Sequence, residues 1–105
     1  MDQALTLSAA FLRAVRTRLQ SHASFTLEEV RTRAWRSANF HGARHELALW
    51  FEGETAGTEA DALLSELGRE ALSVPGQILA EWRLATEERL PSCVRLRIEA
   101  LTVCC

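Results

Sequence analysis

Hydrophobic and polar residues alternate along this chain with two periods, and the period of 3.6 residues predicts two helices. Near the N-terminus the residues that recur every fourth position are Leu7, Phe11, Val15 and Leu19. They form one face of an amphipathic helix over residues 3–21. A second helix is predicted over residues 58–72, with Thr58 as its N-terminal cap three residues before Asp61. Its apolar stripe consists of Ala60, Leu63, Leu64, Leu67 and Ala71.

Four other segments alternate with a period of two, which predicts strands over residues 27–36, 46–52, 77–86 and 93–103. Residues 27–30 taken alone also fit a helical turn, but the β-branched residues that follow favour a strand. The apolar faces of the last two strands are predicted to be Ile78, Ala80, Trp82 and Leu84, and Val94, Leu96, Ile98 and Ala100. Residues 37–42 are predicted to form a turn, and residues 87–92 a hairpin connection with Glu87 and Glu88 at its tip.

The order of elements, α-β-β-α-β-β, predicts an α+β fold with a four-stranded, largely antiparallel sheet and both helices packed on one face. A chain of 105 residues is long enough for one domain, residues 1–105, and too short for two. The other face of the sheet is predicted to carry Trp35, Trp50, Leu79, Leu101 and Val103 among Arg31, Arg33, Glu81, Arg83, Arg95, Arg97 and Glu99. Aromatic residues and arginines in such a mixture are typical of an interface, although scattered exposed apolar residues are also normal.

Composition narrows the function classes. The net charge of −2 does not direct the chain to nucleic acid or to an anionic membrane. All 12 basic residues are arginine, which coding by a GC-rich genome explains more simply than phosphate binding. The three cysteines, Cys93, Cys104 and Cys105, form neither a disulfide framework nor a metal-binding spacing, which indicates a reducing cytoplasm. The chain has no signal-peptide pattern and no apolar run near the roughly 18 residues of a membrane span.

Catalytic and metal-binding patterns are weak in this sequence. His41 and His45 lie near Asn39 and Arg44, but a metal site needs a third ligand and only Glu46 is close. A solvated turn or a protein-docking loop is the simpler interpretation. Neither a Gly-rich phosphate loop nor a Ser-His-Asp arrangement occurs. We therefore predict no enzymatic activity, no cofactor and no metal, and a function that depends on the protein surface.

The whole pattern resembles the tail-completion or tail-terminator proteins of long-tailed phages and of gene transfer agents. Residues 5–19 match the amphipathic N-terminal helix of that family. Residues 35–50 match a tryptophan, a polar loop and a strand that begins near a histidine. An Ala/Leu-rich helix follows at residues 60–72, and residues 95–102, Arg-Leu-Arg-Ile-Glu-Ala-Leu-Thr, resemble the family's last strand. The segment before Trp35 is shorter than in most members and contains no proline.

The resemblance implies a structural protein of a virion or phage-like particle, assembled in the bacterial cytoplasm. Six copies are expected to form a ring that caps the tail tube, ends its polymerisation and joins it to the head. The expected partners are other copies of the chain, the major tail tube protein and the head–tail connector protein, with no membrane and no sequence-specific nucleic acid. The residues expected at these interfaces are Arg33, Trp35, Asn39, His41, Arg44, His45, Trp50, Leu79, Arg95 and Arg97.

A second interpretation is a small dimeric module that binds a protein or nucleic acid. It uses the uncovered face of the sheet and an arginine-rich segment formed by Arg31, Arg33, Arg36 and Arg44. Glu28 and Glu29 next to this segment weaken an electrostatic interaction with phosphate. An enzyme with an unrecognised site is the third and least favoured interpretation.

Overall fold

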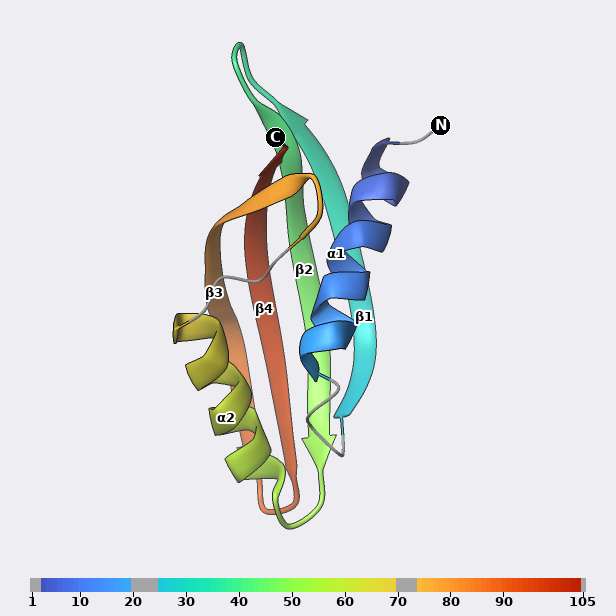
Figure 1. Cartoon of the computed structure of the whole chain (residues 1–105). Coiled ribbons are helices and arrows are strands. Elements are labelled where there is room, and N and C mark those ends of the chain that lie inside the picture. Colours follow the sequence, from blue (N-terminus) through green and yellow to red (C-terminus); the bar gives the residue numbers. More distant parts are fainter. Residues whose placement is uncertain (1–2, 20–24, 70–73, 105) are drawn as a thin grey trace.

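The computed structural model describes residues 3–19, 25–69 and 74–104, with side chains for residues 9–19, 25–66 and 74–104 (Figure 1). The elements in chain order are α1 (Gln3–Leu19), β1 (Phe25–Arg36), β2 (His41–Glu52), α2 (Ala56–Arg69), β3 (Gln77–Leu90) and β4 (Cys93–Cys104). The predicted α-β-β-α-β-β order and the α+β fold are confirmed. The predicted side-chain positions of Leu7, Leu67 and Ala71 lie outside the described residues, as does Cys105.

The four strands form one antiparallel sheet in the order β1-β2-β4-β3. Two hairpins, β1–β2 and β3–β4, meet where β2 pairs with β4. Because the strands are 12 to 14 residues long, the molecule is elongated, with extents of 47 × 23 × 21 Å. Both helices cover the same face of the sheet (Figure 1).

The hydrophobic core lies between the helices and this face. The helices contribute Phe11, Val15, Leu19, Ala56, Ala60 and Leu63, and the central strands contribute Leu47, Leu49, Phe51, Val94, Leu96 and Ile98. Complete burial of one such leucine or phenylalanine side chain contributes about 1.5–3 kcal/mol. The predicted apolar faces of β2 and β4 are therefore confirmed, and the opposite face of the sheet is left without a covering layer among the described residues.

Helix α2 begins earlier than the sequence predicts. The Ala56 N–H donates to the Gly53 carbonyl at 3.1 Å, and the Glu59 N–H donates to the Thr55 carbonyl at 2.8 Å. Gly53 has a φ of 98°, which allows the sharp turn from β2 into the helix. Thr58 is thus within the first turn of α2, and the prediction that it caps the helix is wrong.

Three irregularities interrupt the described strands, and all of them lie in the edge strands β1 and β3. They are extra residues at Glu28, Ala80 and Ala85. The bulge at Ala80 keeps both Leu79 and Trp82 on the helix side, where both contact the core. Ile78 consequently faces away from the helices. The predictions that Ile78 and Ala80 point inward and that Leu79 lies on the uncovered face are wrong.

Both hairpin turns are tighter than predicted. Strand β3 continues to Leu90 and only Pro91 and Ser92 separate it from β4, so Glu87 and Glu88 lie within the strand and not at a hairpin tip. Strand β2 begins at His41, after a turn in which the Ser37 N–H donates to the Phe40 carbonyl at 2.7 Å. His45, predicted to lie in the docking loop, is therefore a strand residue.

Candidate functional site

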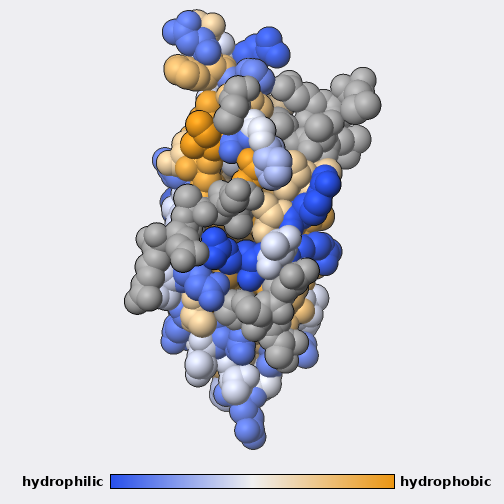
Figure 2. Space-filling view, viewed as in Figure 1, coloured by the Kyte–Doolittle hydropathy of each residue, from blue (hydrophilic) through white to orange (hydrophobic). Residues whose placement is uncertain are grey.

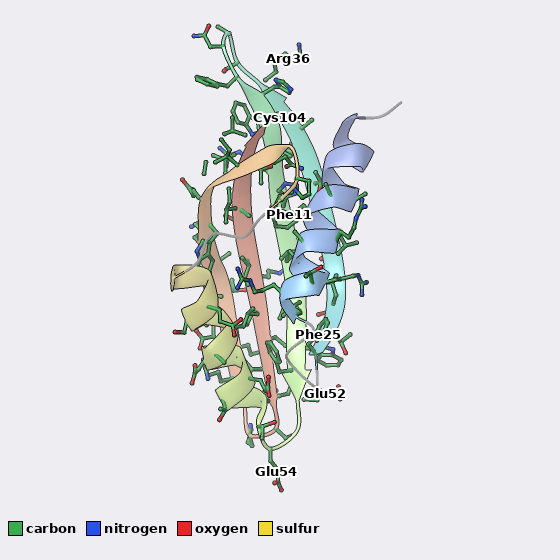
Figure 3. The ribbon with its side chains drawn as sticks, viewed as in Figure 1. Phe11, Phe25, Arg36, Glu52, Glu54 and Cys104 are labelled. Carbon is green, nitrogen blue, oxygen red and sulfur yellow. The ribbon has the colours of Figure 1, made fainter. Side chains whose placement is uncertain are left out.

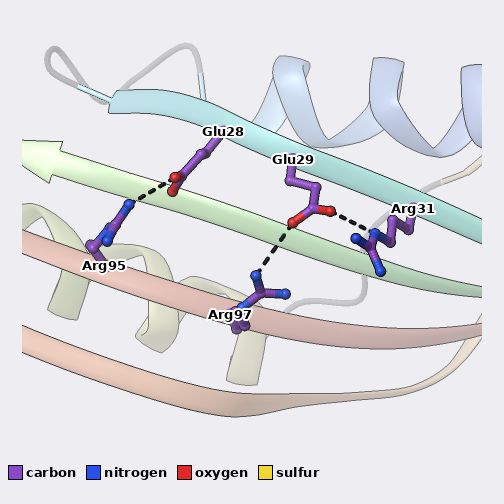
Figure 4. Close-up of polar contacts among 5 residues, drawn as sticks. All are labelled: Glu28, Glu29, Arg31, Arg95 and Arg97. Atoms are coloured by element: carbon purple, nitrogen blue, oxygen red, sulfur yellow. Dashed lines mark hydrogen bonds and ion pairs between the residues drawn. The ribbon is translucent and has the colours of Figure 1, made fainter.

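We call the side of the sheet that faces away from the helices the open face. Its centre is covered by ion pairs between β1 and β4, which lie on either side of β2 (Figure 4). Arg95 bonds to Glu28 at 2.7 Å, and Arg97 bonds to Glu29 at 3.3 Å. Glu29 also bonds to Arg31 at 2.5 Å. Adjacent strand residues normally point to opposite faces; the bulge at Glu28 instead directs both glutamates to the open face.

A small residue beneath these ion pairs makes them possible. Glu29, Ala48 and Arg97 lie in one row across β1, β2 and β4. Because Ala48 has only a methyl group, the two charged side chains meet above it and leave it 7% exposed. Exposed ion pairs of this kind contribute about 0–1 kcal/mol each. They cover the sheet with neutralised charge and add little to its stability.

Trp50 lies within this covered region. The guanidinium carbon of Arg95 is 5.4 Å from the centre of the indole ring, a cation–π arrangement. Glu28 holds Arg95 in that position. The Trp50 indole Nε1 is buried and has no hydrogen-bond partner among the described residues. Trp50 is on the open face as predicted, but its ring is already packed under the Arg95 side chain of the same chain.

The end of the open face nearest the β1–β2 turn is different. Arg33 and Arg44 are direct cross-strand neighbours, and neither forms an ion pair with a described residue. Like charges in this position repel each other. Together with Arg31, Thr32 and Glu46 they line a shallow hollow. Because Arg31 is paired with Glu29, the hollow has two unpaired arginines, Arg33 and Arg44, and one glutamate, Glu46.

A row of apolar residues crosses all four strands beside this hollow. Trp35, Gly42, Val103 and Ile78 are register partners from β1 to β3. Gly42 is required here, since a Cβ atom would lie 1.9 Å from the Thr102 carbonyl oxygen. Ile78 is 60% exposed. We call Arg33, Arg44, Trp35, Val103 and Ile78 the hairpin-end patch.

Phe40, in the turn of the same hairpin, is 61% exposed. Figure 2 shows that hydrophobic residues also gather just below the hairpin tip on the side of the molecule drawn there. The apolar surface therefore reaches beyond the open face at this end of the molecule.

The helix-covered face contains a row of four polar side chains, three buried and one partly buried, that the sequence analysis did not identify. The row consists of Thr32, His45, Thr102 and Gln77, one from each strand. His45 Nδ1 is 3.0 Å from Thr32 Oγ1, and His45 Nε2 is 3.0 Å from Thr102 Oγ1. The Thr102 hydroxyl donates to Gln77 Oε1 at 2.5 Å. Because the Thr102 hydroxyl donates its proton to Gln77, Thr102 Oγ1 accepts the proton of His45 Nε2. The Thr32 hydroxyl then donates to His45 Nδ1.

His45 is fully buried, with its ring stacked on Phe11 of α1 at a centroid distance of 3.8 Å. Burial lowers the pKa of His45 from 6.5 to about 4, against an opposing effect of the Gln77 side chain. The imidazole is neutral near pH 7 and inaccessible to solvent in the single chain. The structure thus gives His45 a place in the core instead of the predicted interface.

The predicted site residues fall into three groups. Those on the open face are Arg33, Trp35, Arg44, Trp50, Arg95 and Arg97. Asn39 is exposed in the β1–β2 turn, and His41 begins β2 beside it. His45 and Leu79 lie on the helix side. The structure brings Arg33, Trp35 and Arg44 together at one end, and Trp50, Arg95 and Arg97 in the centre.

Hollows of very different size occur in the part of the chain that the structure describes, and the hollow lined by Arg33 and Arg44 has a volume of about 480 Å³. A cavity of about 30 Å³ lies between the helices, bounded by Phe11, Val15, Leu63 and Trp82. This is far below the roughly 300–1,000 Å³ of a ligand pocket. No group of three or more His, Cys, Asp or Glu side chains among the described residues is placed to bind a metal. Cys93 and Cys104 are free thiols.

The described helices are too short or too polar for any of them to cross a membrane. Comparison of the chain with protein-family models, with curated proteins and with solved structures gave no match.

Proposed function

We propose that this chain is a non-catalytic assembly subunit that acts by binding copies of itself. In this proposal several copies, six by resemblance to tail terminators, form a ring that caps a phage-type tail tube, ends its polymerisation and joins it to the head connector. The observation that supports the proposal is the one-sided sheet. Both helices cover one face, and the open face carries unpaired arginines and a tryptophan at one end.

The edge strands favour a contact through faces and ends over a contact between strand edges. The unpaired backbone groups of an edge strand are a template for a further strand. Here bulges at Glu28, Ala80 and Ala85 interrupt both edges of the sheet, which disfavours such pairing. A ring in addition requires two different, complementary patches on each subunit.

The β1–β2 turn is the proposed docking element for the tube or the connector. Asn39 and Phe40 are exposed there at the far end of the molecule, where an apolar side chain on a short turn has access to a neighbouring protein. Such a particle would be assembled in the bacterial cytoplasm, and the mature ring would lie in the tail.

The alternative function is a dimeric module that binds a protein or nucleic acid. The unpaired Arg33 and Arg44 beside Trp35 favour it, because arginine and an aromatic ring together suit an acidic or phosphate-bearing ligand. Binding to nucleic acid that weakens steeply with salt would support this alternative.

Sedimentation velocity from micromolar to near-millimolar concentration tests the proposal. A mass that rises toward six subunits is the expected result, and electron microscopy should then show closed rings. Replacing Trp35 with glutamate should prevent the association. A tight dimer at the lowest concentration would contradict the ring and support the binding module.

A further inference from the structure

The hairpin-end patch has a counterpart of opposite charge at the other end of the same open face. We infer that copies of this chain bind one another by placing the hairpin-end patch of one copy against the acidic end of the next, defined below. This inference rests on the proposed self-association and identifies the surfaces that carry it.

The acidic end consists of Glu52, Glu54 and Leu90. Glu52, Cys93 and Leu90 form a row across β2, β4 and β3 on the open face, and Glu54 follows in the turn before α2. Both glutamates are exposed, and neither forms an ion pair with a described residue. Figure 3 shows Arg36 and Glu54 at opposite ends of the long axis.

Arg89 and Arg95, the arginines of β3 and β4 near this end of the sheet, are already bound to other groups. Arg89 forms ion pairs with Asp61 at 2.6 Å and with Glu87, and these two contacts raise its pKa. Glu52 and Glu54 therefore remain as uncompensated negative charges beside Leu90, which is 53% exposed.

The two ends match in three respects. Each combines exposed apolar side chains with unpaired charges, the charges have opposite signs, and both lie on or next to the open face. Two hairpin ends would place Arg33 and Arg44 against their own copies, and like-charge contacts of this kind are unfavourable. The centre of the open face does not influence which ends of two copies meet, because its glutamates and arginines are already paired within one copy.

Opposite-end pairing is the arrangement that a ring requires, because each copy then presents two different surfaces. The rotation between neighbours decides how many copies close the assembly. If each pair of copies used both ends reciprocally, the same contact would close after two copies. The mass of the assembly therefore tests the ring, and the identity of the contact is tested separately by charge reversal.

The experiment uses two double variants of the full chain, R33E/R44E and E52R/E54R. Alone, each variant has two ends of the same sign, so we expect its self-association to weaken by at least about 100-fold. In an equimolar mixture every contact between unlike variants again joins opposite charges. We expect the mixture to regain the mass of the wild-type assembly in sedimentation velocity. The control R13E/R16E makes the same charge change as R33E/R44E, but on exposed residues of α1, and it should associate like the wild type.

Far-UV circular dichroism of each variant verifies that it is folded, and recovery in the mixture itself excludes unfolding as the cause of dissociation. The inference would be overturned if either variant associated as tightly as the wild type, or if the mixture stayed dissociated. Neither result would decide whether the chain forms a ring through another contact. Recovery to two copies would support the contact and contradict the ring. A wild-type chain that stays monomeric at near-millimolar concentration would overturn the inference.

Discussion

Replacing Thr102 with valine would remove one hydroxyl group from the buried polar row while keeping the shape of the side chain nearly unchanged. Thr102 is fully buried, and its hydroxyl accepts a hydrogen bond from His45 Nε2 and donates one to Gln77 Oε1. Valine can do neither. The variant therefore leaves a donor and an acceptor without partners in a region closed to water by α1.

The size of the effect follows from these two groups. A buried polar group that loses its partner costs about 1–3 kcal/mol. With partial relaxation of the Gln77 amide we expect T102V to lower the free energy of unfolding by about 2–4 kcal/mol. For a domain of this size 1 kcal/mol corresponds to about 4–8 °C in Tm, so Tm should fall by at least about 8 °C.

Urea unfolding, followed by tryptophan fluorescence and circular dichroism at pH 7.5, measures this change. The control T17V alters an exposed threonine of α1 and should change stability by less than about 0.5 kcal/mol. A second test is the double variant H45L/T102V, in which the unpaired imidazole donor no longer exists. The loss in its free energy of unfolding should be smaller than the sum of the losses in the two single variants by about 1 kcal/mol or more.

A T102V variant as stable as T17V would refute this account of the buried row. Strict additivity between H45L and T102V would refute the bond between the two side chains, even if each variant alone were destabilised.

Three further predictions concern other contacts. Because burial holds the pKa of His45 at about 4 against 6.5 when unfolded, the unfolded chain binds more protons between these values. The contribution of His45 to the free energy of unfolding is fully present above pH 6.5 and falls by roughly 3 kcal/mol as the pH drops to 4. Urea unfolding of H45L over the same pH range should lack this decrease, and an equal decrease in H45L and the wild type would contradict the prediction. G42A should lose more than about 2 kcal/mol, because its new Cβ would meet the Thr102 carbonyl oxygen at 1.9 Å, and a wild-type Tm would contradict the close approach. E29Q should lose less than about 1 kcal/mol, because its ion pairs are partly exposed, and a larger loss in urea unfolding would show that the charged cover is structural.

Alternation in the sequence was sufficient to predict the faces of β2 and β4, and of β1 from Val30 to Trp35. It failed in β3, where the extra residue at Ala80 exchanges the faces of Ile78 and Leu79. A bulge depends on how the edge strand fits its neighbour, and this fit has no period in the sequence. The bulge at Glu28 was missed for the same reason, and with it the ion pairs to Arg95 and Arg97.

A signal for the buried row was present in the sequence. His45 is in phase with Leu47 and Leu49, and Thr102 is in phase with Ala100 and Ile98. A polar residue in phase with an apolar face indicates a buried hydrogen bond, provided that the strand is extended far enough to include it. The sequence analysis predicted that this strand begins at residue 46, whereas β2 begins at His41. His45 was therefore assigned to a turn, and the signal was missed.

The hairpin-end patch was predicted only in part. The sequence placed Trp35 and Arg33 on the open face, and the structure confirms this. That Arg33 lies directly opposite Arg44, and that Trp35 shares a row with Ile78, depends on strand order and register. Neither neighbour relation can be predicted from the residues around Arg33 or Trp35, because β4 lies between β2 and β3 in the sheet.

The buried polar row also selects one alignment of the four strands over its alternatives. If β4 slipped by two residues along β2, its apolar side chains would stay on the helix side, but Ala100 or Cys104 would take the place of Thr102 beside the imidazole. Such a misaligned sheet would bury nearly as much apolar surface as the correct one, but it would leave His45 with an unmatched proton donor. The row therefore favours the native alignment over one shifted by two residues, because apolar burial alone distinguishes poorly between these two alignments.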